Sequence, residues 1–95
     1  MEFKREKMQD LLKKELKKYF PKAKIYLFGS RARGDNSFYS DFDIALESDE
    51  DLGGKIAEFK YFLEESNIPY KVDIVELKKA PYLKEVIEKE GILWS

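Results

Sequence analysis

The sequence contains no cysteine and no histidine. Their absence excludes disulfide frameworks, thiolate or imidazole metal sites, and catalytic arrangements built on Cys or on a Ser–His pair. Any chemistry in this chain must therefore rely on oxygen ligands. A signal-peptide-like apolar segment and an apolar run of membrane-spanning length are also missing, so we expect a soluble, cytoplasmic protein with no membrane partner.

The chain is too short for two domains. Its 95 residues suffice for one core, because independent cores usually need on the order of 100 residues each. We therefore expect a single domain over residues 1–95. The chain is 43% hydrophobic and 15% aromatic, so it can bury a core although 39% of its residues are charged. This composition argues against intrinsic disorder.

The net charge of -1 hides an uneven distribution along the chain. Residues 1–24 hold nine basic and four acidic residues, whereas residues 35–51 hold seven acidic residues and no basic one. A solvated helix face explains the basic segment better than a nucleic-acid patch, because acidic residues interrupt it and no aromatic stacking platform accompanies it. Nucleic acid is therefore a disfavoured partner, and the acidic segment requires another explanation.

Hydrophobic periodicity and chain breakers predict six elements in the order α-β-β-α-β-α. The predicted helices cover residues 3–20, 51–65 and 81–91, and the predicted strands cover residues 25–28, 42–46 and 70–77. The short apolar tail, residues 92–94, is expected to pack back on the core. An α+β fold, with a small mixed sheet backed by helices, is the simplest architecture for this order.

Two of the predicted helices are amphipathic, with apolar residues at helical spacing. In the first helix these positions are Met8, Leu11, Leu12, Tyr19 and Phe20. In the second they are Leu52, Ile56, Phe59 and Leu63. Each helix is expected to bury this face against the sheet.

Three aspartates occupy predicted strands. Side chains alternate across a strand, so Asp41 and Asp43 project from one face while Phe42 and Ile44 point into the core. By the same alternation, Val72 and Ile74 point into the core and Asp73 projects from the opposite face of its strand. Asp is a poor strand former, so its place between β-branched residues indicates a specific role.

If the second and third strands are neighbours, the three carboxylates converge and repel one another unless a cation lies between them. Mg²⁺ is the natural ion, because it prefers carboxylate oxygens. The alternative is that Asp41 and Asp43 are ordinary solvent-side residues, and for an Asp-x-Asp pattern alone this alternative is favoured. The residues that precede Asp41 in the sequence make the metal-binding interpretation the better one.

A glycine-serine turn follows the first predicted strand. Gly29 permits a close backbone approach, and the Ser30 hydroxyl and free N–H groups at a helix start could bind phosphate oxygens. Arg31 and Arg33 could add positive charge. A Gly-Ser turn alone is usually only a turn, and Arg33 could equally form a salt bridge with a nearby aspartate.

Ten residues separate the Gly29-Ser30 turn from the Asp41-Phe42-Asp43 pattern. This arrangement is similar to the signature of the polymerase-beta-like nucleotidyltransferase superfamily, and the sequence of the two patterns resembles that of the superfamily's minimal nucleotidyltransferases. The matching positions are Gly29, Ser30, Ala32, Arg33, Gly34, Ser40, Asp41, Asp43 and Ile44. Asp73 matches the family's third carboxylate on a later strand. The resemblance covers nearly the whole chain, which lacks only the additional helical domain of larger relatives.

The resemblance implies a Mg²⁺-dependent transfer of AMP from ATP to a hydroxyl, with release of pyrophosphate. One ion would be held by Asp41, Asp43 and Asp73, and a second would be shared by Asp41 and Asp43. Gly29 and Ser30 would hold the departing phosphates, and Arg33 is a candidate phosphate contact. Asp73 is also a candidate acceptor for the proton of the attacking hydroxyl.

The resemblance also implies a partner. Minimal nucleotidyltransferases of this kind look like antitoxins that attach adenylyl groups to a tyrosine of a helical HEPN-type toxin. The alternative is a non-catalytic antitoxin that neutralises its partner by contact. Antibiotic modification normally needs a larger acceptor-binding domain. The residues leave the acceptor, the nucleotide base and the oligomeric state open.

Overall fold

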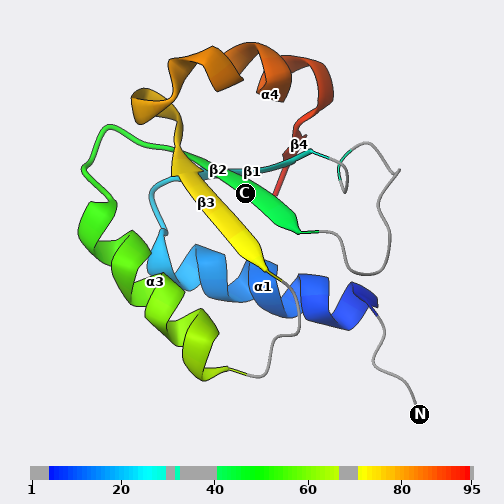
Figure 1. Cartoon of the computed structure of the whole chain (residues 1–95), viewed down its shortest axis with the longest axis vertical. Helices are drawn as coiled ribbons and strands as arrows, with labels where there is room; N and C mark the ends of the chain where they lie inside the picture. The colour runs from blue at the N-terminus through cyan, green and yellow to red at the C-terminus, as the bar shows by residue number, and fades with distance from the viewer. Residues whose placement is uncertain (1–4, 30–31, 33–40, 67–70, 95) are drawn as a thin grey trace.

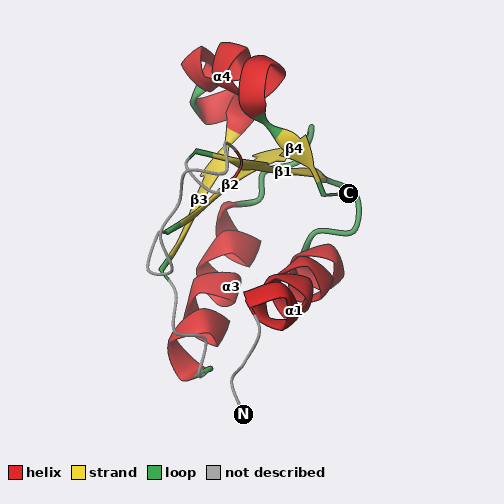
Figure 2. Ribbon diagram, turned by 90° about the vertical axis from the view of Figure 1, so that its right-hand side faces the viewer, coloured by secondary structure: helices red, strands yellow, loops and turns green. Residues whose placement is uncertain are grey.

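The computed structural model of the chain describes residues 5–29, 32, 41–66 and 71–94. A four-stranded sheet in the order β3-β2-β1-β4 lies between helices on both faces (Figure 1, Figure 2). The helices are α1 (Arg5–Tyr19), α3 (Gly53–Glu65) and α4 (Lys84–Glu90), and the strands are β1 (Lys24–Phe28), β2 (Phe42–Glu47), β3 (Val72–Glu76) and β4 (Ile92–Leu93). Two short 3-10 helices, η1 (Leu77–Lys79) and η2 (Pro81–Leu83), join β3 to α4.

The sheet is mixed, as predicted. β1 pairs antiparallel with β2 and with β4, whereas β2 and β3 run parallel. The three predicted strands are present with small shifts at their ends. The predicted α+β class is therefore confirmed.

The predicted element order was wrong at the C-terminus, where a fourth strand follows the last helix. β4 has only two residues, too few for any alternation to appear in the sequence. It is held at the edge of the sheet by pairing with β1, and the Trp94 N–H extends this pairing by donating to the Ile25 carbonyl at 2.7 Å. The tail does pack on the core, because Trp94 is buried.

One face of the sheet is covered by α1 and α3 (Figure 2). Most of the core lies there, and α1 with the residue that follows it contributes Leu12, Leu16 and Phe20, which are four residues apart and fully or nearly fully buried. The prediction placed Leu11 on this face and omitted Leu16. Leu11 is 40% exposed, because it is one position away from the row that faces the sheet.

Aromatic packing joins α1 to α3. The ring of Phe59, on α3, is completely buried and meets Tyr19 edge-on at 5.0 Å and Phe20 at 6.0 Å between ring centroids. Edge-to-face pairs of this kind add to the stabilisation from burial. The α3 face predicted from the sequence is confirmed, with Leu52 also buried and Ile56 and Leu63 partly buried against it.

Among the described residues, α4 and the 3-10 helices pack on the other face of the sheet (Figure 1). Ile87 of α4 and Leu77 pack there with Ala45 of β2, which is completely buried. The sequence predicted a half-buried β2, whereas β2 is buried on both sides at this point. Within the described residues, none of the helices combines the length and apolar character needed to cross a membrane.

Candidate functional site

One row of residues crosses the sheet on the face of α4. In the register of the strands, Phe28 of β1 is opposite Asp43 of β2, and Asp43 is opposite Asp73 of β3. Neighbouring strands lie about 4.8 Å apart, so the two aspartates are adjacent across the sheet. The condition under which the sequence brings these carboxylates together, that the second and third strands are neighbours, is therefore met.

The alternation of side chains directs both aspartates away from the main core. Phe42 and Ile44, on either side of Asp43, are 1% and 0% exposed, while Asp43 itself is only partly buried. Asp73 is exposed on β3, which is an edge strand of the sheet. The row thus presents two carboxylates at a surface that a large molecule can reach.

Asp41 immediately precedes β2 and is partly buried. The next residue, Phe42, donates its N–H to the Lys71 carbonyl at 2.9 Å, so the chain is fixed to its neighbouring strand at this point. Across the described ranges, no group of three acidic side chains is already gathered closely enough to hold a metal ion. The predicted trio of Asp41, Asp43 and Asp73 therefore stays a prediction as a metal site.

Gly29 lies directly against Asp43. Its φ of +80° is in the left-handed region, which glycine adopts at no steric cost. A Cβ at this position would stand 3.2 Å from the Asp43 Cγ and still closer to Oδ2. The sequence predicted that phosphate approaches the backbone closely at Gly29, and this stays a prediction; the structure shows that the carboxylate of Asp43 lies against Gly29.

The turn after Gly29 begins with a hydrogen bond from the Ala32 N–H to the Gly29 carbonyl, at 3.1 Å. Ser30 and Arg33 lie outside the described residues, as do Arg31, Gly34 and Ser40. The roles predicted for Ser30 and Arg33 toward phosphate therefore stay predictions.

The sequence reasoning missed Glu76, a buried charged residue at the end of β3. The side chain is buried, and its Oε1 accepts a hydrogen bond from the Leu52 N–H at 3.2 Å while Oε2 lies 3.0 Å from the Lys79 Nζ. It thereby joins the end of β3 to the start of α3. The available signal was its position in the alternation Val72, Ile74, Glu76, which places a charged residue on the core face.

The pairing with Glu76 has an electrostatic effect on Lys79. The hydrogen bond and the charge of Glu76, followed by the charge of Asp51, raise the pKa of the Lys79 ammonium above its ordinary value. Lys79 is therefore charged in the folded protein, and it compensates the buried carboxylate. A buried carboxylate without such a partner would be strongly destabilising.

Comparison with known proteins points in one direction. Residues 10–94 match the nucleotidyltransferase domain family. A Methanocaldococcus jannaschii protein named "Putative protein adenylyltransferase MJ1379" is 38% identical over 84 residues, which cover 84% of this chain and 84% of that protein. The stretch that matches the family, residues 10–94, includes the whole row of Phe28, Asp43 and Asp73.

Two solved structures resemble the chain over most of its length. One is a mutant of the toxin-antitoxin MntA-HpeT, with 31% identity and a TM-score of 0.69, covering 90% of this chain and 69% of that chain. The other is described as a toxin-antitoxin with AMP-PNP, with 26% identity and a TM-score of 0.67, covering 93% and 72% of the two chains.

Proposed function

Because the chain belongs to the nucleotidyltransferase domain family, we propose that it transfers AMP from ATP to a protein hydroxyl in a Mg²⁺-dependent reaction. The acceptor that we propose is a tyrosine of a HEPN-type toxin, so that the chain acts as an antitoxin. The name of the archaeal relative supports protein adenylylation, and the two toxin-antitoxin structures support the partner and the nucleotide. The observation that carries the proposal is the pair of adjacent carboxylates, Asp43 and Asp73, with Gly29 against the first.

The donor atoms in this row fit magnesium. Asp41, Asp43 and Asp73 offer only carboxylate oxygens, which are the ligands that Mg²⁺ prefers, and two of them are opposite each other on paired strands. We propose that these three residues hold the metal, with two ions shared among them. When bound, Mg²⁺ supplies charge neutralisation at the phosphates and makes an attacking hydroxyl more acidic.

The protein groups act on the two ends of the transfer. We propose that the backbone at Gly29 and the Ser30 hydroxyl hold the phosphates that leave, with Arg33 as a further contact. The tyrosine oxygen bonds to the α-phosphorus, and the bond from this phosphorus to the bridging oxygen breaks, which releases pyrophosphate. Asp73 accepts the tyrosine proton. The exposed position of Asp73 suits an acceptor that arrives on another protein.

The experiment is intact-mass measurement of the toxin after incubation with this chain, ATP and Mg²⁺. The toxin should gain one or more AMP units, and replacing its acceptor tyrosine with phenylalanine should abolish the gain. Asp43→Asn in this chain should abolish it too, because a neutral amide is a poor ligand for the metal. An unmodified toxin with the wild-type chain would contradict the proposal.

A second candidate is an antitoxin that acts by contact alone. It fits the two toxin-antitoxin structures, because neutralisation by contact needs a paired toxin but no transfer of AMP. Under this alternative, Asp43→Asn would still neutralise the toxin fully and no AMP would be transferred. Toxin activity measured with both forms of the chain therefore distinguishes the two candidates.

A further inference from the structure

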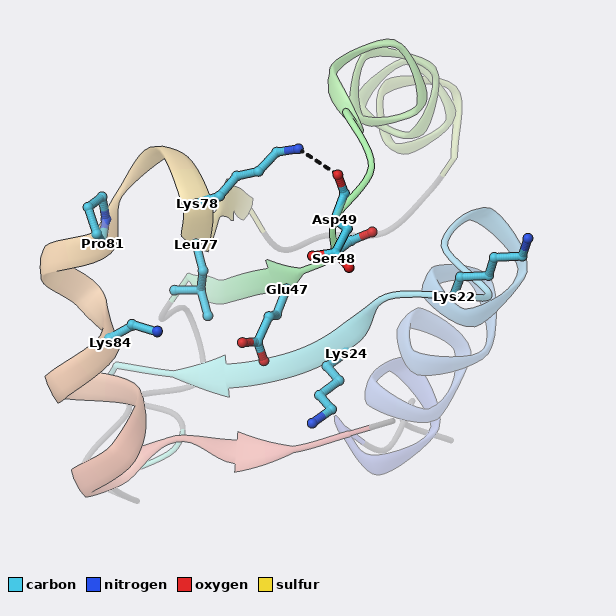
Figure 3. Close-up of a pocket in the computed structure, with 9 residues that line it drawn as sticks. All are labelled: Lys22, Lys24, Glu47, Ser48, Asp49, Leu77, Lys78, Pro81 and Lys84. Carbon is cyan, nitrogen blue, oxygen red and sulfur yellow. Dashed lines mark hydrogen bonds between the residues drawn. The ribbon is translucent and has the colours of Figure 1, made fainter.

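A cavity of about 430 Å³ lies on the same face of the sheet as the carboxylate row, at the other end of the strands (Figure 3). It is formed by the turn before β1, the end of β2, η1 and the start of α4. Its volume is within the range of about 300 to 1,000 Å³ typical of small-molecule sites. The cavity is large enough for a mononucleotide or a smaller anion.

The lining of this cavity is positively charged. Four lysines contribute to it, two from the start of β1 and the turn before it and one each from η1 and α4: Lys22, Lys24, Lys78 and Lys84. The carboxylates in the lining are Glu47 and Asp49, so four positive and two negative charges leave a net charge of +2. Bringing several ammonium groups together costs free energy unless an anion compensates them.

These lysines differ from the neighbouring Lys79, which is neutralised within the protein by Glu76 at 3.0 Å and by Asp51 at 3.8 Å. Among the described residues, Lys22, Lys24 and Lys84 form no ion pair. Lys78 donates to a backbone carbonyl, that of Asp49, at 3.2 Å (Figure 3). The lysines of the cavity are therefore less compensated by carboxylates than Lys79 is.

Glu47 lies within the cavity, between the side chains of Lys24 and Lys84 (Figure 3). Its Oε1 accepts a hydrogen bond from the Tyr26 hydroxyl at 3.2 Å, which fixes its position. Burial of Tyr26, together with this hydrogen bond and the charge of Glu47, raises the pKa of Tyr26, so the hydroxyl keeps its proton and remains a donor. The other oxygen of Glu47 is available to a hydroxyl or amino group of a ligand.

The cavity is separate from the carboxylate row. Glu47 pairs with Lys24 and Asp43 pairs with Phe28, so the two pairs are four residue steps, or about 13 Å, apart along the strands. The Tyr26 and Ala45 positions between them lie in the cluster that packs with Ile87 of α4. A ligand in the cavity therefore does not occupy the proposed catalytic site.

We propose that this cavity binds a phosphate-bearing small molecule, either a nucleotide or free pyrophosphate, at a second site. Lys24 and Lys84 bind the phosphate oxygens, because ammonium groups are strong point-charge donors to phosphate. Lys22 and Lys78 stand at the rim. Glu47 accepts a hydrogen bond from the ligand where the ligand carries a donor, as the ribose and base of a nucleotide do.

The test is a titration of the ¹⁵N-labelled chain, without divalent metal and at physiological salt, with pyrophosphate, AMP and ATP in separate arms. We expect saturable chemical-shift changes at the amides of Lys24, Glu47 and Lys84. The arm with the highest affinity shows which of the three molecules the cavity prefers. The Lys24→Gln/Lys84→Gln variant should bind about tenfold more weakly or worse. Both lysines are exposed, so this variant keeps the fold.

The matched control is Lys60→Gln/Lys89→Gln, which removes two exposed lysines from α3 and α4 outside the cavity. It should bind as the wild type does. Asp43→Asn/Asp73→Asn should also keep this binding, since it alters only the carboxylate row. Three results would each overturn the proposal: equal weakening in the two lysine variants, shifts confined to the carboxylate row, or no saturable binding in any arm. None of them depends on whether the chain transfers AMP.

Discussion

The two faces of the sheet differ in how they are covered. On the face of α1 and α3, fourteen of the described residues form one buried apolar cluster, whereas the face of α4 has a cluster of three. The second face carries Asp43, Asp73 and the lysine-lined cavity. The difference indicates that one face supplies most of the stability, and that the other is left partly open for binding. Substitutions on the two faces should therefore have different effects.

The largest loss of stability is expected from Phe59→Ala. The ring is completely buried against Tyr19 and Phe20 at the end of α1, and truncating a buried Phe costs about 3 to 5 kcal/mol. Urea unfolding followed by circular dichroism measures the change. A loss below about 1 kcal/mol would show that the α1–α3 face does not dominate stability.

On the α4 face, Ile87→Ala should cost less, about 2 kcal/mol. Ile87 is 8% exposed and belongs to the small cluster, so the surface can relax into part of the space left behind. The same unfolding experiment applies. If Ile87→Ala destabilises the chain as much as Phe59→Ala does, the contrast between the two faces is wrong.

Glu76→Gln tests the link between the end of β3 and the start of α3. The amide oxygen can still accept the hydrogen bond from Leu52, but the charge-assisted contact with Lys79 is lost, so we expect a cost of about 1 kcal/mol. Glu76→Ala serves as the comparison and should cost more, because it leaves the Leu52 N–H without its partner. Equal stability of all three proteins would contradict this role.

The smallest effect is expected from Asp51→Asn at the start of α3. The Asp51 carboxylate accepts a hydrogen bond from the Gly53 N–H at 3.0 Å, and this bond, with the charge of Lys79, lowers the pKa of Asp51 below its ordinary value of 3.8. A lowered folded-state pKa contributes stability that is present above 3.8 and is lost as the pH falls through the folded-state pKa.

Thermal unfolding of wild type and Asp51→Asn at neutral pH and at successively lower pH measures this effect. The small advantage of the wild type at neutral pH should shrink below pH 3.8. An advantage that is the same at every pH would show that the charge of Asp51 does not contribute.

Much of the fold could be predicted from local patterns. Alternation identified β2 and β3, and helical spacing identified the buried face of α3. β4 could not be predicted, because a two-residue strand exists only through its pairing with β1. The burial of Ala45 on the second face was equally inaccessible, because it depends on where α4 packs.

For the site, alternation alone gave the faces of Asp43 and Asp73. Their adjacency depends on the parallel pairing of β2 with β3, which a single sequence does not encode in any local pattern. The contact of Gly29 with Asp43 joins the turn after β1 to β2 and was not predicted, because the sequence reasoning assigned the close approach at Gly29 to phosphate. Glu76 had a signal, a charge at a core position, that the sequence reasoning did not use.

The most direct test of the account is to measure stability and AMP transfer together for Asp73→Asn. Asp73 is exposed, so the free energy of unfolding should change by less than about 0.5 kcal/mol. The rate of AMP transfer to the toxin should fall by about 10² to 10⁴-fold, because the proton acceptor and a proposed metal ligand are lost. Lys71→Gln, at an exposed position beside β3, should leave both unchanged. A folded Asp73→Asn protein that transfers AMP at the wild-type rate would contradict the central claim.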